Sequence, residues 1–250
     1  MTRRRWIADE VRGDTAALIG EHAAHLARVL RAEVGQEFDI ATGDGVRCGK
    51  ITAISQDRVE FALGAERAGR VQVRSSIPQI TLVLSIFKFD RMEWAIEKCT
   101  EIGVARIIPL IARRSDSHLA TAAVKRQERW QRIVRQASEQ SRRAVMAEIV
   151  APVRLKELGG NGALPTSATR VVLAESLVGL DEGMGLREIL QARPTEGEVV
   201  LAVGPEGGWA EEEFVLFRDS GWIAASLGET ILRAETAAIV ACALAIDSLR

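Results

Sequence analysis

One stretch of the chain indicates the fold more clearly than any other, and it reads Val199-Val200-Leu201-Ala202-Val203-Gly204-Pro205-Glu206-Gly207-Gly208. Its first five residues form a continuous apolar run, which is typical of a parallel β-strand covered on both faces. A helix is expected at residues 211–220, because three acidic residues occupy what would be its first turn. A strand, a glycine loop and a helix in this order predict an α/β domain with a parallel sheet.

The same alternation of strands and helices extends outward from this stretch. Continuous apolar runs predict further buried strands at residues 80–84, 106–111 and 171–174, and a short strand at residues 225–227. Helices are predicted over residues 90–103, 122–143 and 234–249. Asp90 is expected to cap the first of these helices, and Gly103 to end it. We therefore expect a parallel α/β domain over residues 73–250.

The first 72 residues have a different pattern. Apolar and polar residues alternate at 37–41 and 59–63, which is typical of half-buried strands. The sequence Thr42-Gly43-Asp44-Gly45 predicts a hairpin turn, because glycine accepts the positive φ that such turns need. One helix is expected at residues 21–29, and a linker at residues 70–78. A small β-rich domain over residues 1–72 is therefore expected to precede the α/β domain.

The composition is that of an ordinary globular protein, with 47% hydrophobic and 27% charged residues. No apolar run approaches the roughly 20 residues that a membrane helix needs, and no apolar segment follows the basic N-terminus as in a signal peptide. Cys48, Cys99 and Cys242 lack CxxC spacing, which argues against a zinc site and a disulfide framework. His22 and His25 have no third ligand nearby and are interpreted as surface or packing residues. We expect a cytoplasmic protein without a metal or a membrane segment.

Charge is distributed unevenly along the chain, although the net charge is only −1. Residues 106–143 contain ten Lys and Arg against three Asp and Glu, a balance of +7, whereas residues 175–221 have a balance of −8. A nearly neutral chain divided in this way can present a face that binds phosphate groups. A solvated helix surface would explain the same charges.

Two glycine loops are the candidate ligand site. Residues 204–208 follow a buried strand, and ligands of open α/β sheets bind at the carboxyl ends of strands. The loop lacks both GxGxxG and Gly-Lys-Ser/Thr, so it is not a phosphate loop. A second glycine loop at residues 227–237 carries Arg233, Glu235 and Thr236 and leads into the last helix. A tight turn or an ordinary helix entry would explain either loop alone, but the pair indicates one composite pocket.

Together the two loops resemble the signature of the RsmE family, whose members methylate N3 of a uridine in small-subunit ribosomal RNA. The resemblance continues upstream in Lys88, Glu93, Lys98, Glu101 and Gly103, in Arg114-Ser115, and in residues 137–143. Residues 4–51 also resemble the small RNA-binding domain of the family, so nearly the whole chain is covered. The departures from the usual family pattern are Arg142, Ala147, Thr230 and Ala234.

The resemblance implies a fold and an activity. The expected fold is an α/β domain of the SPOUT class, with a parallel sheet and a C-terminal trefoil knot, preceded by a small PUA-like β-barrel domain. The implied cofactor is S-adenosyl-L-methionine, bound in the knot, and the implied partners are 16S rRNA or the small ribosomal subunit and a second copy of the chain in a homodimer. Two alternatives remain, namely a non-catalytic RNA-binding assembly factor and a methyltransferase with another RNA target.

Roles for individual residues follow from this resemblance together with the chemistry. Removing the N3 proton of uridine leaves negative charge that an arginine can stabilise, so Arg233 is the first candidate and Arg143 the second. A carboxylate could take the proton, and Glu235 and Glu206 are candidates. Alternatively, Glu235 caps the last helix and pairs with Arg233. The expected cofactor-binding residues are Leu201, Val203, Gly204, Pro205, Glu206, Gly207, Gly208, Ser226, Leu227, Gly228, Ile231 and Leu232.

Basic residues of the predicted helix at 122–143 are the candidates for binding RNA phosphates. They are Lys125, Arg126, Arg129, Arg132 and Arg135. Aromatic residues make up only 4% of the chain and tyrosine is absent, so base stacking can contribute at few positions. We therefore expect RNA recognition through backbone charge and RNA shape.

Overall fold

The computed structural model describes residues 5–66, 79–158, 164–165, 167–174, 184–192 and 198–248. The chain divides into two compact units. The first comprises Met1–Arg74 together with Ser138–Met146, and the second comprises Ser75–Ala137 and Ala147–Arg250. The linker predicted at residues 70–78, and with it the domain boundary expected at residue 72, lies outside the described residues.

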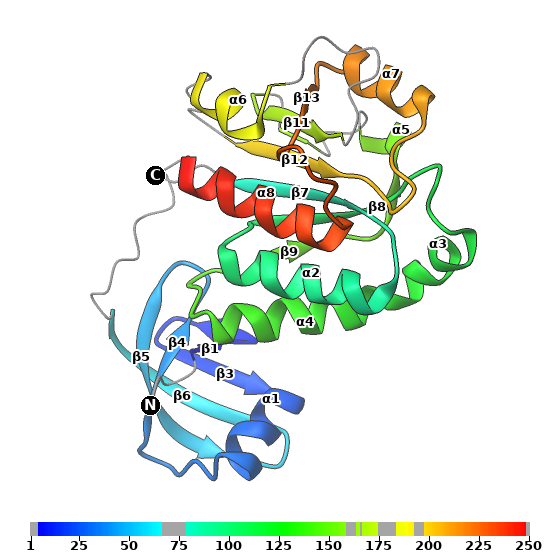
Figure 1. Ribbon diagram of the computed structural model, residues 1–250. Coiled ribbons are helices and arrows are strands. Elements are labelled where there is room, and N and C mark those ends of the chain that lie inside the picture. The colour runs from blue at the N-terminus through cyan, green and yellow to red at the C-terminus, as the bar shows by residue number, and fades with distance from the viewer. Residues whose placement is uncertain are drawn as a thin grey trace. The chain divides into compact units, whose positions relative to one another are not determined.

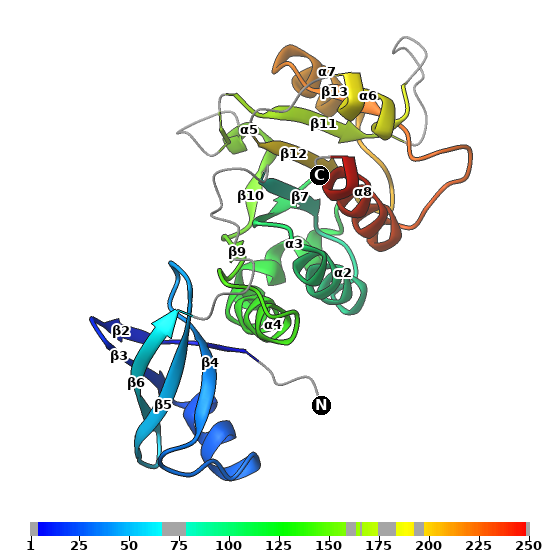
Figure 2. The ribbon, with the colours of Figure 1, turned by 90° about the vertical axis from the view of Figure 1, so that its left-hand side faces the viewer.

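The first unit is built on a six-stranded sheet with the order β1-β4-β5-β6-β3-β2. Its strands are β1 (Trp6–Ile7), β2 (Glu10–Arg12), β3 (Thr15–Ile19), β4 (Glu37–Ala41), β5 (Val46–Ile54) and β6 (Arg58–Glu66). The pairing of β1 with β4 is parallel and the others are antiparallel. Because β1 and β2 follow each other in the chain yet pair with opposite ends of the sheet, the sheet curls round on itself (Figure 2).

The alternation of apolar and polar residues in the first unit produces half-buried strands, as predicted. Alternate residues of β6, among them Val59 and Phe61, are buried in a core with Trp6, while their neighbours face outward. The helix predicted at residues 21–29 is present as α1 (Glu21–Ala24), continued by a π-helical turn at His25–Val29. The imidazole of His25 packs against the Trp6 ring, with 5.9 Å between the ring centroids. The predicted hairpin is confirmed by Gly43, whose φ is 93°.

Arg142, in the segment Ser138–Met146, has a left-handed backbone with a φ of 56°. Its carbonyl accepts a hydrogen bond from the Arg5 guanidinium, which holds this turn in place. A side chain in this region costs about 1–2 kcal/mol, whereas glycine is free of the penalty. The backbone at residue 142 therefore favours glycine, although this chain carries arginine there.

We expect Arg142→Gly to raise the free energy of unfolding by up to about 1 kcal/mol, because it removes the Cβ that the left-handed backbone disfavours. Urea denaturation measures the change. Arg142→Ala is the matched control, since it removes the guanidinium but keeps the Cβ. An equal gain in both variants would contradict the explanation and would point to the charge instead.

The second unit contains a seven-stranded sheet in which all pairings among the described residues are parallel. Its order is β10-β8-β7-β12-β11-β13, with β9 pairing to β8. The strands are β7 (Ile80–Ser85), β8 (Arg106–Ile111), β9 (Glu148–Ile149), β10 (Val153–Arg154), β11 (Thr169–Leu173), β12 (Val199–Val203) and β13 (Ile223–Ala225). The predicted parallel α/β sheet is therefore confirmed.

Helices cover both faces of this sheet (Figure 1). One face packs against α2 (Phe89–Ile102), α4 (Gln127–Gln140), α6 (Leu186–Ala192) and α8 (Ala234–Ser248), and the other against α5 (Leu155–Leu158) and α7 (Glu211–Asp219). Leu82 and Leu84 belong to the first core, whereas Val83 between them belongs to the second. A strand buried on both sides needs apolar residues throughout, which explains the continuous runs.

The boundaries predicted for two of the helices were wrong. The helix expected over residues 122–143 consists of α3 (Ser117–Ala123), a 3₁₀ turn at Val124–Arg126 and α4, which ends at Gln140. It begins early because the Asp116 carboxylate accepts hydrogen bonds from two backbone N–H groups and caps α3. It ends early because the left-handed backbone at Arg142 cannot continue a helix. Asp90 is not a cap but lies in the first turn of α2, after Lys88.

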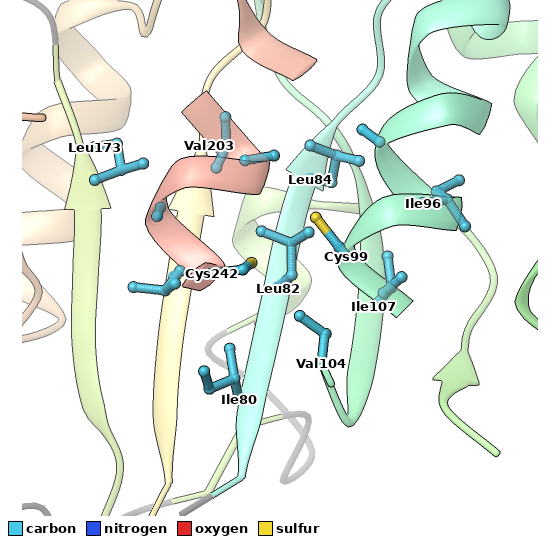
Figure 3. Packing of buried hydrophobic residues seen from close by; sticks show 14 of the residues in the cluster. Ile80, Leu82, Leu84, Ile96, Cys99, Val104, Ile107, Leu173, Val203 and Cys242 are labelled. Carbon is cyan, nitrogen blue, oxygen red and sulfur yellow. The ribbon is translucent and has the colours of Figure 1, made fainter. Parts of the chain in front are cut away.

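The core between α2, α8 and the sheet contains two of the three cysteines (Figure 3). The thiols of Cys99 and Cys242 are fully buried, and hydrogen bonding to Cys99 together with burial raises the pKa of the Cys242 thiol. Cys48 lies in the first unit and is partly exposed. In the described ranges no helix is both long and apolar enough to cross a membrane, and no three metal-ligating side chains gather.

Candidate active site

A cavity of about 520 Å³ opens at the carboxyl ends of three neighbouring strands of the second unit. Leu173 ends β11, Val203 ends β12 and Ala225 ends β13, and all three line the cavity. Small-molecule sites in proteins usually have volumes of about 300–1,000 Å³. The cavity thus has the size and the place in the sheet expected of a ligand site.

The first glycine loop forms one wall of the cavity and is held by Trp209. The indole N–H of Trp209 donates to the carbonyl of Leu173 at 2.9 Å, which ties the loop to β11. A Cβ placed on Gly204 would lie 3.2 Å from two atoms of the Trp209 ring, so glycine permits this close packing. The N–H of Gly208 donates to the carbonyl of Pro205 at 2.8 Å and closes a tight turn. The backbone of the loop therefore forms the cavity wall.

A buried carboxylate supports this loop from behind. Glu213, in the first turn of α7, is only 5% exposed. Its two oxygens accept hydrogen bonds from the backbone N–H of Ala210 at 2.9 Å and of Arg113 at 2.8 Å. The next side chain, Arg114, donates from Nη1 to the carbonyl of Gly207 at 3.0 Å and lines the cavity. The segment after β8 is therefore attached to the first glycine loop at two points.

The second glycine loop also lines the cavity, forming a second wall, and connects β13 to α8. Gly228 has a φ of 120°, a conformation that other residues rarely adopt. Ile231 is 77% exposed although it lines the cavity, so an apolar side chain stands at the cavity mouth. Arg233 is also exposed and lines the cavity, and its carbonyl accepts the N–H of Ala237 in the first turn of α8.

Ten of the twelve expected cofactor-binding residues line this one cavity. They are Val203, Gly204, Pro205, Glu206, Gly207, Gly208, Leu227, Gly228, Ile231 and Leu232. The other two do not line it. Leu201 is fully buried in the core beneath α8, and Ser226 pairs through its backbone with Gly185.

Of the four catalytic candidates, Arg233 and Glu206 line the cavity, whereas Arg143 and Glu235 do not. Arg143 belongs to the segment Ser138–Met146 of the first unit, where its Nε donates to the carbonyl of Val145 at 3.2 Å. Glu235 lies in the first turn of α8, and its side chain is only 8% exposed. In the described part of the chain Glu235 pairs with Arg91, not with Arg233 as the alternative interpretation expected.

Several further lining residues were not among the sequence candidates, among them Leu173, Ala174, Arg91 and Arg114. Leu173 and Ala174 could have been found, because they end a predicted strand. Arg91 and Arg114 reach the cavity from segments about 100 residues away in sequence from the loops that they contact. No periodicity marks them, and Arg114 stood out only through its resemblance to the RsmE pattern. The role of Arg114 depends on the place of β8 in the sheet.

The five basic residues proposed for RNA lie on the 3₁₀ turn and on α4. Two of them are engaged with Glu93 of α2, since Arg126 Nη1 lies 3.2 Å and Arg129 Nε 2.7 Å from its Oε1. The guanidinium of Arg126 also lies over the Phe89 ring, 4.7 Å from its centroid. The hydrogen bond to Glu93 raises the pKa of Arg129. These two charges are thus partly neutralised within the unit, although both side chains are accessible.

Comparison with known proteins places this chain among the RNA methyltransferases. A family model described as an RNA methyltransferase domain matches residues 74–246. A relative from Synechocystis sp. is 32% identical over 92% of this chain and 72% of its own length. A relative from Aquifex aeolicus is 30% identical over 93% of this chain and 94% of its own length. Both are named ribosomal RNA small subunit methyltransferase E, and the chain belongs to this RsmE family.

Solved structures agree with this assignment. The ribosomal RNA small subunit methyltransferase E of Neisseria gonorrhoeae, bound to S-adenosyl methionine, matches with a TM-score of 0.80 and 30% identity, covering 96% of this chain and 95% of the other. A Legionella pneumophila protein in complex with the same cofactor matches with a TM-score of 0.77 and 28% identity. The match covers 96% of this chain and 94% of the other.

Proposed function

We propose that this protein uses S-adenosylmethionine to methylate N3 of one specific uridine in the decoding region of 16S rRNA. The observation that carries the proposal is the single cavity of about 520 Å³ formed by both glycine loops at the strand ends. Membership of the RsmE family supports the reaction, and two similar structures contain the same cofactor.

The lining of the cavity suits S-adenosylmethionine, which combines a flat apolar base with many polar groups. Val203, Leu227 and Leu232 offer apolar surface, while the backbone of residues 204–208 offers N–H and C=O groups. Glycine at 204, 207 and 208 lets a ligand approach that backbone closely. Bound in this way, the cofactor would supply an already activated methyl group on its sulfonium.

The protein then has to align the uridine and manage one proton. Arg233 lies at the cavity with an exposed guanidinium, where it can stabilise the negative charge that develops on the uracil ring as N3 loses its proton. Glu235 and Glu206 are the carboxylates proposed to receive the proton. Glu206 lines the cavity, whereas Glu235 is buried and has one oxygen without a hydrogen-bond partner among the described residues. Arg143 remains a second candidate for charge stabilisation.

The proposal also includes a PUA-like RNA-binding domain, a C-terminal trefoil knot and a homodimer. The curled sheet of the first unit supports a PUA-like RNA-binding domain. The return of the chain from the edge strand β13 to α8, which packs against β7 and β12, supports a C-terminal trefoil knot. Apolar residues on most sides of α8 support a homodimer. Arg132 and Lys125 are exposed and would bind RNA phosphates on a cytoplasmic small ribosomal subunit.

The decisive test is mass spectrometry of 16S rRNA from two strains. One lacks the gene for this protein, and the other is the same deletion strain in which the protein is expressed again. We expect 3-methyluridine to be absent in the deletion strain and to return with the chain. Unchanged 3-methyluridine would overturn the proposed target, and loss of a different methylated nucleotide would identify another one. Calorimetry with S-adenosylmethionine separates enzyme from assembly factor, because a non-catalytic factor would not bind the cofactor.

A further inference from the structure

Arg91, in the first turn of α2, is a lining residue of the cavity that comes from neither glycine loop. Its guanidinium contacts carboxylates from both loop regions. Nη1 lies 3.1 Å from Oε1 of Glu206 in the first loop. Nε lies 3.8 Å from Oε1 of Glu235, which belongs to the second loop segment where it enters α8. One planar cation therefore joins the two walls of the cavity.

Because it involves a buried carboxylate, loss of this bridge should destabilise the protein more than loss of a surface ion pair. The side chain of Glu235 is 8% exposed and that of Arg91 is 32% exposed, whereas Glu206 is 44% exposed. A buried carboxylate is costly unless a cation or hydrogen-bond donors compensate it, and removal of the compensating cation is strongly destabilising. Arg91 is the cation that compensates Glu235 in the described part of the chain.

The geometry of Glu235 also leaves a free acceptor. Its Oε1 faces Arg91, while its Oε2 is buried and has no hydrogen-bond partner in the described residues. Buried polar atoms are nearly always hydrogen-bonded, so an orphaned oxygen points to a donor that arrives with a ligand. Arg91 thus holds one oxygen of the carboxylate and leaves the other available.

We propose that Arg91 is a positioning residue of the methyl-transfer site, which sets the spacing of the two loops and orients the carboxylate of Glu235. The inference rests on the proposed function, because it assigns the loop spacing to cofactor binding and the Glu235 orientation to the transfer step. Arginine suits this role, since its fork of N–H donors can hold two carboxylates in fixed directions, whereas lysine is a point charge on a flexible stem.

Two quantities test the proposal, namely the Kd of S-adenosylmethionine by calorimetry and the single-turnover rate of methyl transfer at saturating cofactor and RNA. We expect Arg91→Met to raise the Kd and to lower the rate, each by about ten- to a hundredfold, because small displacements of positioned groups have effects of this size. Glu206→Gln should reproduce mainly the loss of affinity, and Glu235→Gln mainly the loss of rate.

The double variant Arg91→Met with Glu206→Gln gives the sharpest result. If Arg91 acts on the first loop through Glu206, the double variant has the same Kd as Arg91→Met alone. A role in stability alone would instead lower the active fraction without changing the Kd. Arg187→Met is the matched control, since Arg187 pairs with Asp247 of α8 at 3.7 Å but does not line the cavity, and it should retain wild-type values.

Failure of the proposed function and failure of the Arg91 proposal give different results. A wild-type chain that binds no S-adenosylmethionine would overturn the proposed function and this inference together. A wild-type chain that binds and transfers, beside an Arg91→Met variant with the same Kd and rate, would overturn this inference alone, as would fully additive effects with Glu206→Gln. If Arg91→Met does not fold, Arg91→Lys is measured instead. A wild-type Kd and a wild-type rate in that variant would likewise overturn the inference.

Discussion

Replacement of Arg233 by alanine is expected to slow methyl transfer by about 10²- to 10³-fold at saturating cofactor and RNA. This is the usual effect of removing a group that stabilises charge in a transition state. Arg233 is exposed, lines the cavity and forms no ion pair with any carboxylate in the described residues. Its charge is therefore available to the uracil ring as N3 loses its proton. The affinity for S-adenosylmethionine should change little, because the guanidinium acts on the other reactant.

Single-turnover transfer of a radiolabelled methyl group to small subunits from the deletion strain measures this effect. Arg218→Ala is the control, because it removes an exposed arginine of α7 that does not line the cavity. Arg233→Lys should recover part of the rate, since it keeps the charge without the planar fork. A wild-type rate for Arg233→Ala, or a loss confined to cofactor affinity, would remove Arg233 from the proposed mechanism.

Replacement of Glu213 by alanine is expected to lower the free energy of unfolding by about 3 kcal/mol. Its buried carboxylate accepts hydrogen bonds from the backbone N–H groups of Ala210 and Arg113. Hydrogen bonds to a charged group contribute about 1.5–3 kcal/mol each, and a buried N–H left without an acceptor is costly. The variant also removes one of the two attachments between the first glycine loop and the segment after β8, so its affinity for S-adenosylmethionine should fall as well.

Urea denaturation of Glu213→Ala and Glu212→Ala provides the comparison. Glu212 occupies the same helical turn but is exposed, so its loss should cost at most about 1 kcal/mol through the helix dipole. Glu213→Gln should be intermediate, because an amide keeps one acceptor oxygen but places an NH₂ group opposite the second N–H. Equal destabilisation by the Ala variants at 212 and 213 would show that the carboxylate does not fasten the loop.

Local sequence patterns predicted the central strands of the α/β unit well, because each is buried on both faces. The strand expected at residues 225–227 was wrong, since β13 spans Ile223–Ala225, and the short strands β9 and β10 were not predicted. The runs at β7, β11 and β12 supply apolar residues alternately to the two cores, as strands covered on both faces must. Helix ends were predicted less well. The start of α3 depends on how the Asp116 side chain turns back to the backbone, and the end of α4 on the φ of Arg142, and neither is visible as a periodicity.

The sequence by itself determined the two glycine loops, because a glycine with positive φ and a strand-to-helix turn depend on near neighbours in the chain. Only the tertiary structure decided which side chains support and complete the pocket that they line. The sheet order β8-β7-β12-β11-β13 differs from the chain order and brings Arg91 and Arg114 to loops about 100 residues further along. Pairing between strands is a long-range property that hydrophobic periodicity does not encode. For the same reason the buried bridge from Glu206 through Arg91 to Glu235 becomes visible only once the strands are in place.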